Sequence, residues 1–179
     1  MAAEAAHKRH NRALECEQEA ERTAQQVDAM WAAATPPKVR PYLADKGVQA
    51  HGVRQDEAGR LLVPVQDADG RMWSVQKIGP NGFKQFQEFG QLEGGHFTIG
   101  DLQRPGPLLI AEGFATAATL DEMTDMPAIA AFIAGNLLPM AQTYRGLYPE
   151  RDIYIAGDTT GSAKPSWTGR GGRRSISAG

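Results

Sequence analysis

Three apolar segments near the C-terminal end constrain the fold of this chain more than any other feature. They cover residues 107–112, where the last residue is an acid, 127–134 and 152–156, and segments of helical character over 114–123 and 137–148 separate them. Strands that are apolar throughout, instead of alternating, are typical of a parallel sheet buried on both faces. The order strand, helix, strand, helix, strand therefore predicts an α/β unit over residues 106–158.

The preceding segment, residues 38–105, has a different pattern, in which Gly residues separate short β-like runs. Two of these runs cover 60–66 and 71–78, and a turn with Gly in the late position joins them. A third run, over 83–89, follows another turn. The pattern predicts an antiparallel β subdomain, so we expect an α/β fold that is α+β when taken over the whole chain.

The two ends of the chain are polar. Residues 1–37 are expected to form a charged helix and a linker, because Ala20, Ala24, Val27 and Trp31 lie on one helical stripe before Pro36-Pro37. Its first half should lie in solvent, either as a plain surface helix or as a linker or partner helix. Residues 159–179 form a basic tail rich in Gly and Ser, which we expect to be disordered.

Composition excludes several classes of protein. The 179 residues carry a net charge of −2, so contacts with nucleic acid must come from a local basic patch. A single cysteine excludes an intramolecular disulfide and a cysteine-based zinc site, and it favours a reducing, cytoplasmic setting. The His residues lack metal-ligand spacing. Because no apolar run approaches the roughly 18 residues of a membrane span, we expect no membrane partner.

Two carboxylates stand out by their position. Glu112 ends the first apolar segment and Asp158 follows the third. The C-terminal ends of parallel strands share one edge of the sheet, so both acids should face the same crevice. Such a pair repels unless a cation lies between its members, and oxygen ligands suit Mg²⁺ or Mn²⁺. The alternative is that each acid caps a helix or faces water.

Several segments together resemble one known family. They are 108–117 with its Glu-Gly pair, a strand running into Gly135-Asn136, the Gly157-Asp158 pair, and upstream 41–48, 60–65, 76–78 and 82–86. This set resembles the Toprim domain of primases from bacterial conjugative plasmids and related mobile elements, together with the β subdomain that precedes it. The resemblance covers about residues 38–158.

The resemblance implies a chemistry for the two acids. Glu112 matches the family's proposed acid/base residue, and Asp158 matches the first acid of the Asp-x-Asp pair that holds the divalent metal. The second acid is replaced by Thr160, and nothing resembles the helix and strand that continue a complete Toprim domain. Catalytic and metal-binding roles for Glu112 and Asp158, with Mg²⁺ or Mn²⁺, are therefore expectations from the family.

The resemblance also gives a role to basic residues of the β subdomain, which would face the template and incoming nucleotides: Lys77, Lys84, Arg60 and Arg71. The alternative is four solvated surface cations. Phe83, Phe86 and Phe89 fit base stacking, but core packing is favoured. We expect Asn136 to act as a helix N-cap and not as a ligand.

Two functional hypotheses follow. The first is a primase core fragment that makes RNA primers from nucleoside triphosphates on single-stranded DNA, in plasmid or mobile-element replication, with a helicase or another replication protein as a further partner. The second is an inactive Toprim remnant that binds nucleic acid or a replication partner. A nuclease or topoisomerase piece is a weaker third option. The composition after Asp158 also favours a truncated or frameshifted product over a genuine basic tail.

Overall fold

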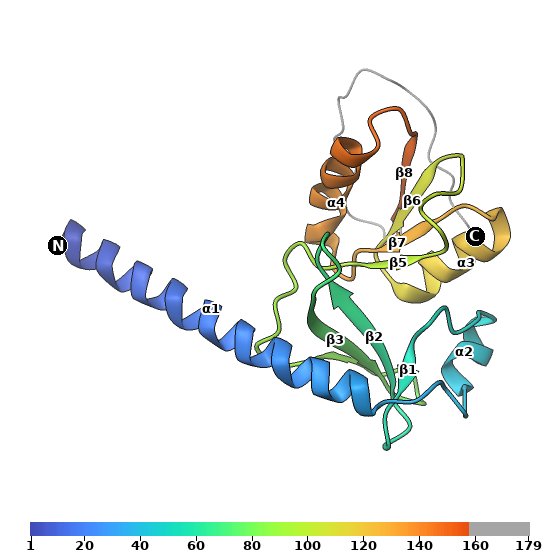
Figure 1. Ribbon diagram of the computed structural model, residues 1–179, viewed down its shortest axis with the longest axis horizontal. Helices are drawn as coiled ribbons and strands as arrows, with labels where there is room; N and C mark the ends of the chain where they lie inside the picture. The colour runs from blue at the N-terminus through green and yellow to red at the C-terminus, as the bar shows by residue number, and fades with distance from the viewer. Residues whose placement is uncertain (158–179) are drawn as a thin grey trace. The chain divides into compact units, whose positions relative to one another are not determined.

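The computed structural model describes residues 1–157, which form two compact units that divide between Phe97 and Thr98. Asp158, Thr160 and the tail over 159–179, with the disorder and the frameshift predicted there, lie outside the described residues. Each unit is built around its own sheet of four strands (Figure 1).

The sheet of the first unit is antiparallel, as the sequence predicted. Its strands follow one another in space in the order β1-β2-β3-β4. The β2–β3 turn forms because the Asp67 Oδ1 accepts hydrogen bonds from the backbone N–H groups of Asp69 and Arg71, at 3.0 and 2.9 Å, while Gly70 takes a left-handed φ of 82°. The strand bounds are β1 (Arg54–Gln55), β2 (Leu61–Gln66), β3 (Met72–Ile78) and β4 (Lys84–Phe86).

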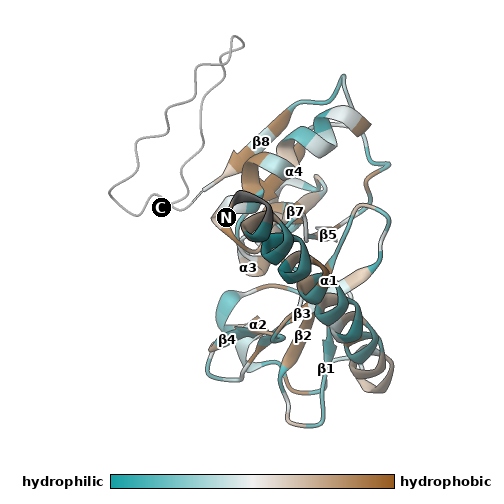
Figure 2. Cartoon of the chain, turned by 90° about the vertical axis from the view of Figure 1, so that its left-hand side faces the viewer, coloured by the Kyte–Doolittle hydropathy of each residue, from teal (hydrophilic) through white to brown (hydrophobic). Residues whose placement is uncertain are grey.

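Two helices accompany this sheet, α1 (Ala2–Ala33) and α2 (Pro41–Lys46). In α1 the predicted stripe is confirmed for Ala20, Ala24 and Val27, which are buried where the helix contacts β3. The side chains of residues 4–19 are all exposed, and Figure 2 shows this hydrophilic half of the helix in teal. No helix within residues 1–157 is long and apolar enough to cross a membrane.

The register of the sheet sorts its side chains into two faces. Leu62, Lys77 and Gln85 stand opposite one another across β2, β3 and β4, and therefore share one face. The adjacent row, which contains Ile78 and Lys84, belongs to the other face. Lys77 and Lys84 therefore project from opposite faces of the same sheet.

The sheet of the second unit has the order β5-β7-β6-β8. Strand β6 pairs in parallel with both β7 and β8, which confirms the predicted parallel core. Strand β5 was not predicted, and the division between the units falls within it, whereas the sequence placed the start of the second unit at residue 106. The strand bounds are β5 (Phe97–Ile99), β6 (Leu108–Ala111), β7 (Ala128–Ala130) and β8 (Ile153–Ala156).

Strands β6 and β7 are buried because helices cover them, whereas the residues of the outer strand β8 are half-buried or exposed. Helices α3 (Phe114–Thr124) and α4 (Ala134–Leu147) are the crossovers that parallel pairing requires. Every residue of β6 and β7 is buried. On the α4 side the core consists of Leu108, Ile110, Ile129, Ala131, Met140 and Tyr144.

Two arginines fix the loop between β5 and β6. The Arg151 guanidinium donates hydrogen bonds to the backbone carbonyls of Leu102, Arg104 and Gly106, at 2.7, 3.1 and 2.8 Å. Arg104 in turn forms ion pairs with Asp121, at 3.1 Å, and with Asp125 at the end of α3. The loop is therefore tied both to the start of β8 and to α3.

Candidate functional site

Glu112 directly follows β6 and is half-buried. Gly113, the next residue, is the N-cap of α3 and has an extended conformation. Because Ala111 pairs with Ala156 in parallel register, β6 and β8 end at the same edge of the sheet. The described residues stop one position before Asp158, so its approach to Glu112 stays a prediction.

The backbone of Glu112 is held by the loop that follows β7. The Phe132 N–H donates a 2.7 Å hydrogen bond to the Glu112 carbonyl, continuing the bond from the Ala131 N–H to the Ala111 carbonyl. Phe132 has a φ of 67°, which is unfavourable for a bulky side chain, and its ring is buried. Strained residues of this kind gather at functional sites, but neither pattern nor composition distinguished Phe132 in the sequence.

Asn136 lies in the first turn of α4, but it is not the N-cap, so that expectation was wrong. The N-cap is Ile133, which forms no side-chain capping bond. Asn136 is 2% exposed, and its Nδ2 donates a 3.1 Å hydrogen bond to the Ala131 carbonyl. The helix begins earlier than predicted, and the amide therefore ties α4 back to the loop that holds Glu112.

The donor set at this edge can be compared with the needs of a divalent cation. Residues 1–157 contain no group of three or more His, Cys, Asp or Glu side chains that could hold a metal. Mg²⁺ does not require such a group, because it keeps several waters and uses one or two carboxylates together with substrate phosphates. Glu112 fits as one such carboxylate, and a second would have to come from outside the described residues.

Lys84 is exposed on β4, and its Nζ lies 5.8 Å from the centre of the Tyr42 ring in α2. A cation at this distance is attracted by the face of the ring. Burial raises the pKa of Tyr42, and its hydroxyl has no hydrogen-bond partner in the described part of the chain. Tyr42 therefore stays neutral and positions the ammonium group of Lys84.

Lys77 lies on the other face of the sheet and is half-buried. Its Nζ donates a 2.6 Å hydrogen bond to the Gln87 Oε1. Partial burial lowers the pKa of Lys77, and the positive charge of Arg60 lowers it further. Arg60 and Lys77 are thus close enough to influence each other, which the sequence could not indicate.

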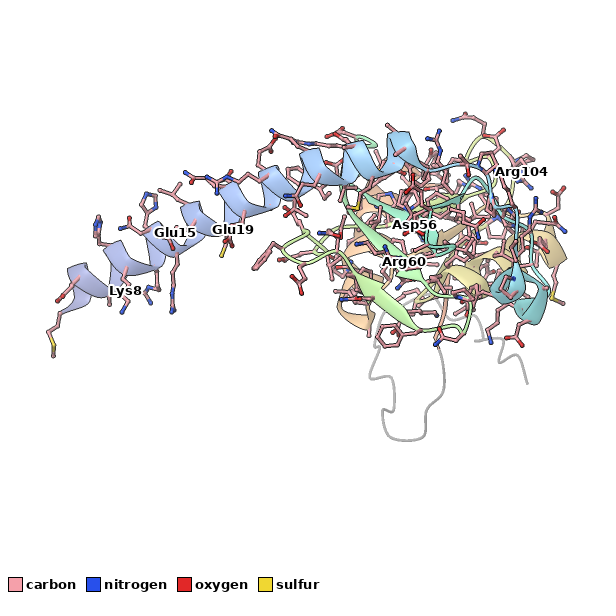
Figure 3. All side chains as sticks on the ribbon, turned by 90° about the horizontal axis from the view of Figure 1, so that it is seen from below. Lys8, Glu15, Glu19, Asp56, Arg60 and Arg104 are labelled. Atoms are coloured by element: carbon pink, nitrogen blue, oxygen red, sulfur yellow. The ribbon has the colours of Figure 1, made fainter. Side chains whose placement is uncertain are left out.

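The other two predicted basic residues are paired with acids. Arg60 forms an ion pair with Asp56 at 2.8 Å, and both side chains, labelled in Figure 3, come from the turn between β1 and β2. Arg71 forms an ion pair with Glu21 of α1 at 2.5 Å and lies 4.0 Å from the centre of the Trp73 ring. Arg71 precedes β3, whereas Lys77 lies near its end. The four basic residues therefore do not form one patch.

Core packing was the favoured interpretation of the three phenylalanines, and for two of them it was wrong. Phe83 is 67% exposed and Phe89 is 68% exposed. Only Phe86, the last residue of β4, is partly buried. The sequence pattern could not distinguish the exposed phenylalanines from the partly buried one. Phe83 and Phe89 lie just outside the short edge strand β4, where no other element covers them.

A surface hollow of about 440 Å³ lies in the first unit. It is bounded by the segment after α1, by the β1–β2 turn and by Pro80. Gln55 contributes to its lining, and the side-chain amide of Gln55 is engaged with the backbone of Lys38, Val39 and Gly59. None of the basic residues predicted to contact nucleic acid lines this hollow.

One unit has an acid at the C-terminal edge of a parallel sheet, and the other has an antiparallel sheet that carries Lys77 and Lys84. These are the parts of a mixed α/β protein that the sequence resemblance implied. Two curated proteins, both described as DNA primase TraC from Escherichia coli, are 40% and 38% identical to the chain over 164 residues, or 88% of its length. The chain therefore belongs among the relatives of bacterial DNA primases, as its motifs predicted.

The chain corresponds to only a small part of each of these relatives. The chain covers 16% and 11% of the lengths of the two relatives. No protein-family model matches the chain.

Solved structures of low similarity were also found. One comes from the bacteriophage T7 lagging-strand DNA polymerase interacting with primase domains of two gp4 subunits, with a TM-score of 0.41 and 13% identity over 66% of this chain and 61% of that one. Another is the DnaG primase catalytic domain bound to ssDNA, with a TM-score of 0.39 and 16% identity over 78% and 54% of the two chains.

Proposed function

We propose that the chain is part of the catalytic core of a DNA primase, and that it joins nucleotides into primers on single-stranded DNA. The observation that supports this most is the 40% identity to a DNA primase over 88% of the chain, a span that includes β subdomain and parallel sheet alike. Plasmid or mobile-element replication, and a helicase or other replication protein as partner, belong to the same proposal.

In this proposal Glu112 is the catalytic carboxylate. It would hold Mg²⁺ or Mn²⁺ together with Asp158, or take the proton of the attacking hydroxyl group as general base. The metal, when bound, neutralises charge on the phosphates of the substrate. The hydrogen bond from the Phe132 N–H fixes the Glu112 backbone at 2.7 Å and so limits where the carboxylate can reach.

Lys84 and Lys77 would bind phosphates of template and nucleoside triphosphate. The chain has a net charge of −2, so this attraction must be local and should weaken as salt is added. Each lysine that contacts a single strand contributes about 0.7 to the slope of log affinity against log salt. Arg60 and Arg71 are less suited to this role because each already forms an ion pair with an acid.

Primer synthesis by the purified chain tests the proposal. Single-stranded DNA, nucleoside triphosphates and Mg²⁺ or Mn²⁺ should yield short oligoribonucleotides, and Glu112→Gln should abolish them without lowering the melting temperature. Glu150→Gln, a change at an exposed acid between α4 and β8, is the matched control and should leave synthesis unchanged.

A second candidate function has one observation in its favour, the Thr at position 160 where the resembled family has an acid. In that case the chain binds nucleic acid but makes no primer. Metal titration separates the two functions: a catalytic core binds Mn²⁺ and loses that binding in Glu112→Gln, whereas a binding module shows no Glu112-dependent metal uptake.

A further inference from the structure

Two exposed phenylalanines flank the outermost strand of the first sheet. Phe83 immediately precedes β4, and Phe89 follows it by three residues. Each ring leaves about two thirds of its surface in water, at 67% and 68% exposure. A single exposed apolar residue needs no explanation, but two exposed aromatic residues at the two ends of one short edge strand do.

The backbone beneath Phe89 is fixed in an unfavourable conformation. Phe89 has a φ of 59°, in the left-handed region that a bulky residue rarely adopts. The turn that contains it is closed by a hydrogen bond from the Gly90 N–H to the Gln87 carbonyl, at 3.2 Å. Gly90 lies so close to the buried Ser74 that a side chain at that position would clash with it. The strain is thus imposed by packing, and its result is an exposed ring.

Phe83 is fixed equally well at the other end of β4. The Gly79 N–H donates a 2.8 Å hydrogen bond to the Phe83 carbonyl, and the Phe83 N–H donates a 3.1 Å hydrogen bond to the Asn81 Oδ1. Phe83 lies opposite Gly79, two residues before Gln85 along the strand direction. Since residues two apart in a strand share a face, Phe83 lies on the face of Gln85 and Lys77. Phe83 and the ammonium group of Lys77 therefore lie on the same face of the sheet, near its edge strand.

We propose that Phe83 and Phe89 are stacking residues for the bases of a single-stranded nucleic acid whose phosphates contact Lys77, the lysine on the same face of the sheet as Phe83. This deepens the proposed primase function and rests on it. A preformed aromatic ring stacks on any base, and neighbouring cations neutralise the backbone, so such a surface binds without sequence preference. Because strand β4 separates Phe83 from Phe89, the two rings would stack on different nucleotides.

The test measures binding of an oligo-dT, and of the same backbone without bases, by fluorescence anisotropy at several salt concentrations. Phe83→Ala and Phe89→Ala should each weaken binding of oligo-dT about tenfold, the size typical of losing one stacked base. Phe83→Trp should bind oligo-dT about as tightly as the wild type, because it keeps an aromatic ring. Phe83→Leu should bind as weakly as Phe83→Ala, because leucine keeps apolar bulk but has no ring. Neither alanine variant should change binding of the abasic backbone.

Salt dependence separates stacking from phosphate contact. The phenylalanine variants should keep the wild-type salt slope, whereas Lys77→Ala should reduce it by about 0.7. Met123→Ala, which shortens another exposed apolar side chain at 80% exposure, is the control for nonspecific effects. The melting temperature of each variant reports whether it folds.

The outcomes are distinguishable. If the phenylalanine variants bind oligo-dT as tightly as the wild type while Lys77→Ala binds more weakly, the stacking surface is wrong and the primase proposal stands. If the wild-type chain binds neither oligo-dT nor the abasic backbone at low salt, both proposals fail. If the wild type binds the abasic backbone as well as oligo-dT, only the phosphate contacts remain.

Discussion

Strands β6 and β4 show how differently the two units use a sheet. All four residues of β6 are buried, and helices cover the strand. All three residues of β4 are exposed or half-buried, and one edge of the strand is free in the described sheet order. In β6 the side chains stabilise the fold and only the residue after the strand, Glu112, is available for chemistry.

The contrast assigns different tasks to the two sheets in our account. The parallel sheet offers the end of a strand, where backbone bonds fix a single acid. The antiparallel sheet offers side chains along an edge, on two faces at once, with Lys77 on one and Lys84 on the other. A sheet buried on both faces could not present cations in this way, since burying an unpaired charge is costly.

The largest effect of a single substitution is expected at the core of the parallel sheet. Ile110 is 0% exposed in β6, so Ile110→Ala should lower the free energy of unfolding by about 2–5 kcal/mol. Gln85→Ala, in the exposed part of β4, should change it by less than about 0.5 kcal/mol. Urea unfolding measures both, and equal effects would contradict the contrast between the strands.

A smaller loss is expected where the second unit buries a charge. The Asp121 side chain is 10% exposed and pairs with Arg104 at 3.1 Å. Arg104→Ala removes this cation and should cost about 2 kcal/mol of unfolding free energy, because a buried carboxylate loses its ion pair with Arg104. Asp125→Asn alters the other, exposed end of the same bridge and should cost far less.

The first unit has its own buried titratable group, His96, at 4% exposure. Burial lowers the pKa of His96 below its usual 6.5. The unfolded chain therefore binds more protons than the folded one between pH 6.5 and the lower folded pKa, so stability falls as the pH drops through that window. Urea unfolding from pH 7.5 to 5 should show this slope, and His96→Gln should flatten it. His10→Gln, a change on the exposed part of α1, should leave the slope as it is.

The smallest effect is expected at the surface of the first unit. Arg60 pairs with Asp56 at 2.8 Å, and its side chain is 44% exposed. Arg60→Ala should therefore lower the unfolding free energy by no more than about 0.5 kcal/mol, as is usual for exposed pairs four residues apart. A loss of unfolding free energy above about 1 kcal/mol would contradict this expectation and would show that the Arg60–Asp56 pair behaves as a buried pair.

The parallel sheet was predictable from the sequence because its strands carry their own signal. Continuous apolar runs such as 108–111 require burial on both faces wherever they lie. The stripe of α1 was predictable for the same reason. Strand β5 was not, since it has only three residues and joins the sheet through a neighbour, β7, that is distant in sequence.

The candidate site was predictable in its residue types but not in its arrangement. Glu112 followed from its position after an apolar run. The separation of Lys77 from Lys84 depends on the register between β3 and β4, which no local pattern encodes. The exposure of Phe83 and Phe89 depends on which elements cover β4. The left-handed backbone of Phe132 accompanies a hydrogen bond to the Glu112 carbonyl, 20 residues earlier in the chain, which no local pattern indicates.

The division of tasks between the two sheets is tested most directly by primer synthesis at increasing concentrations of single-stranded DNA, with nucleoside triphosphates kept at saturation. The variant Lys77→Ala/Lys84→Ala should need more DNA to reach half its maximal rate but should approach the wild-type rate at saturation, because it weakens binding and leaves the chemical step intact. Glu112→Gln should show no synthesis at any DNA concentration while binding DNA as the wild type does. A Glu112→Gln chain that synthesises primers at the wild-type rate would contradict the account.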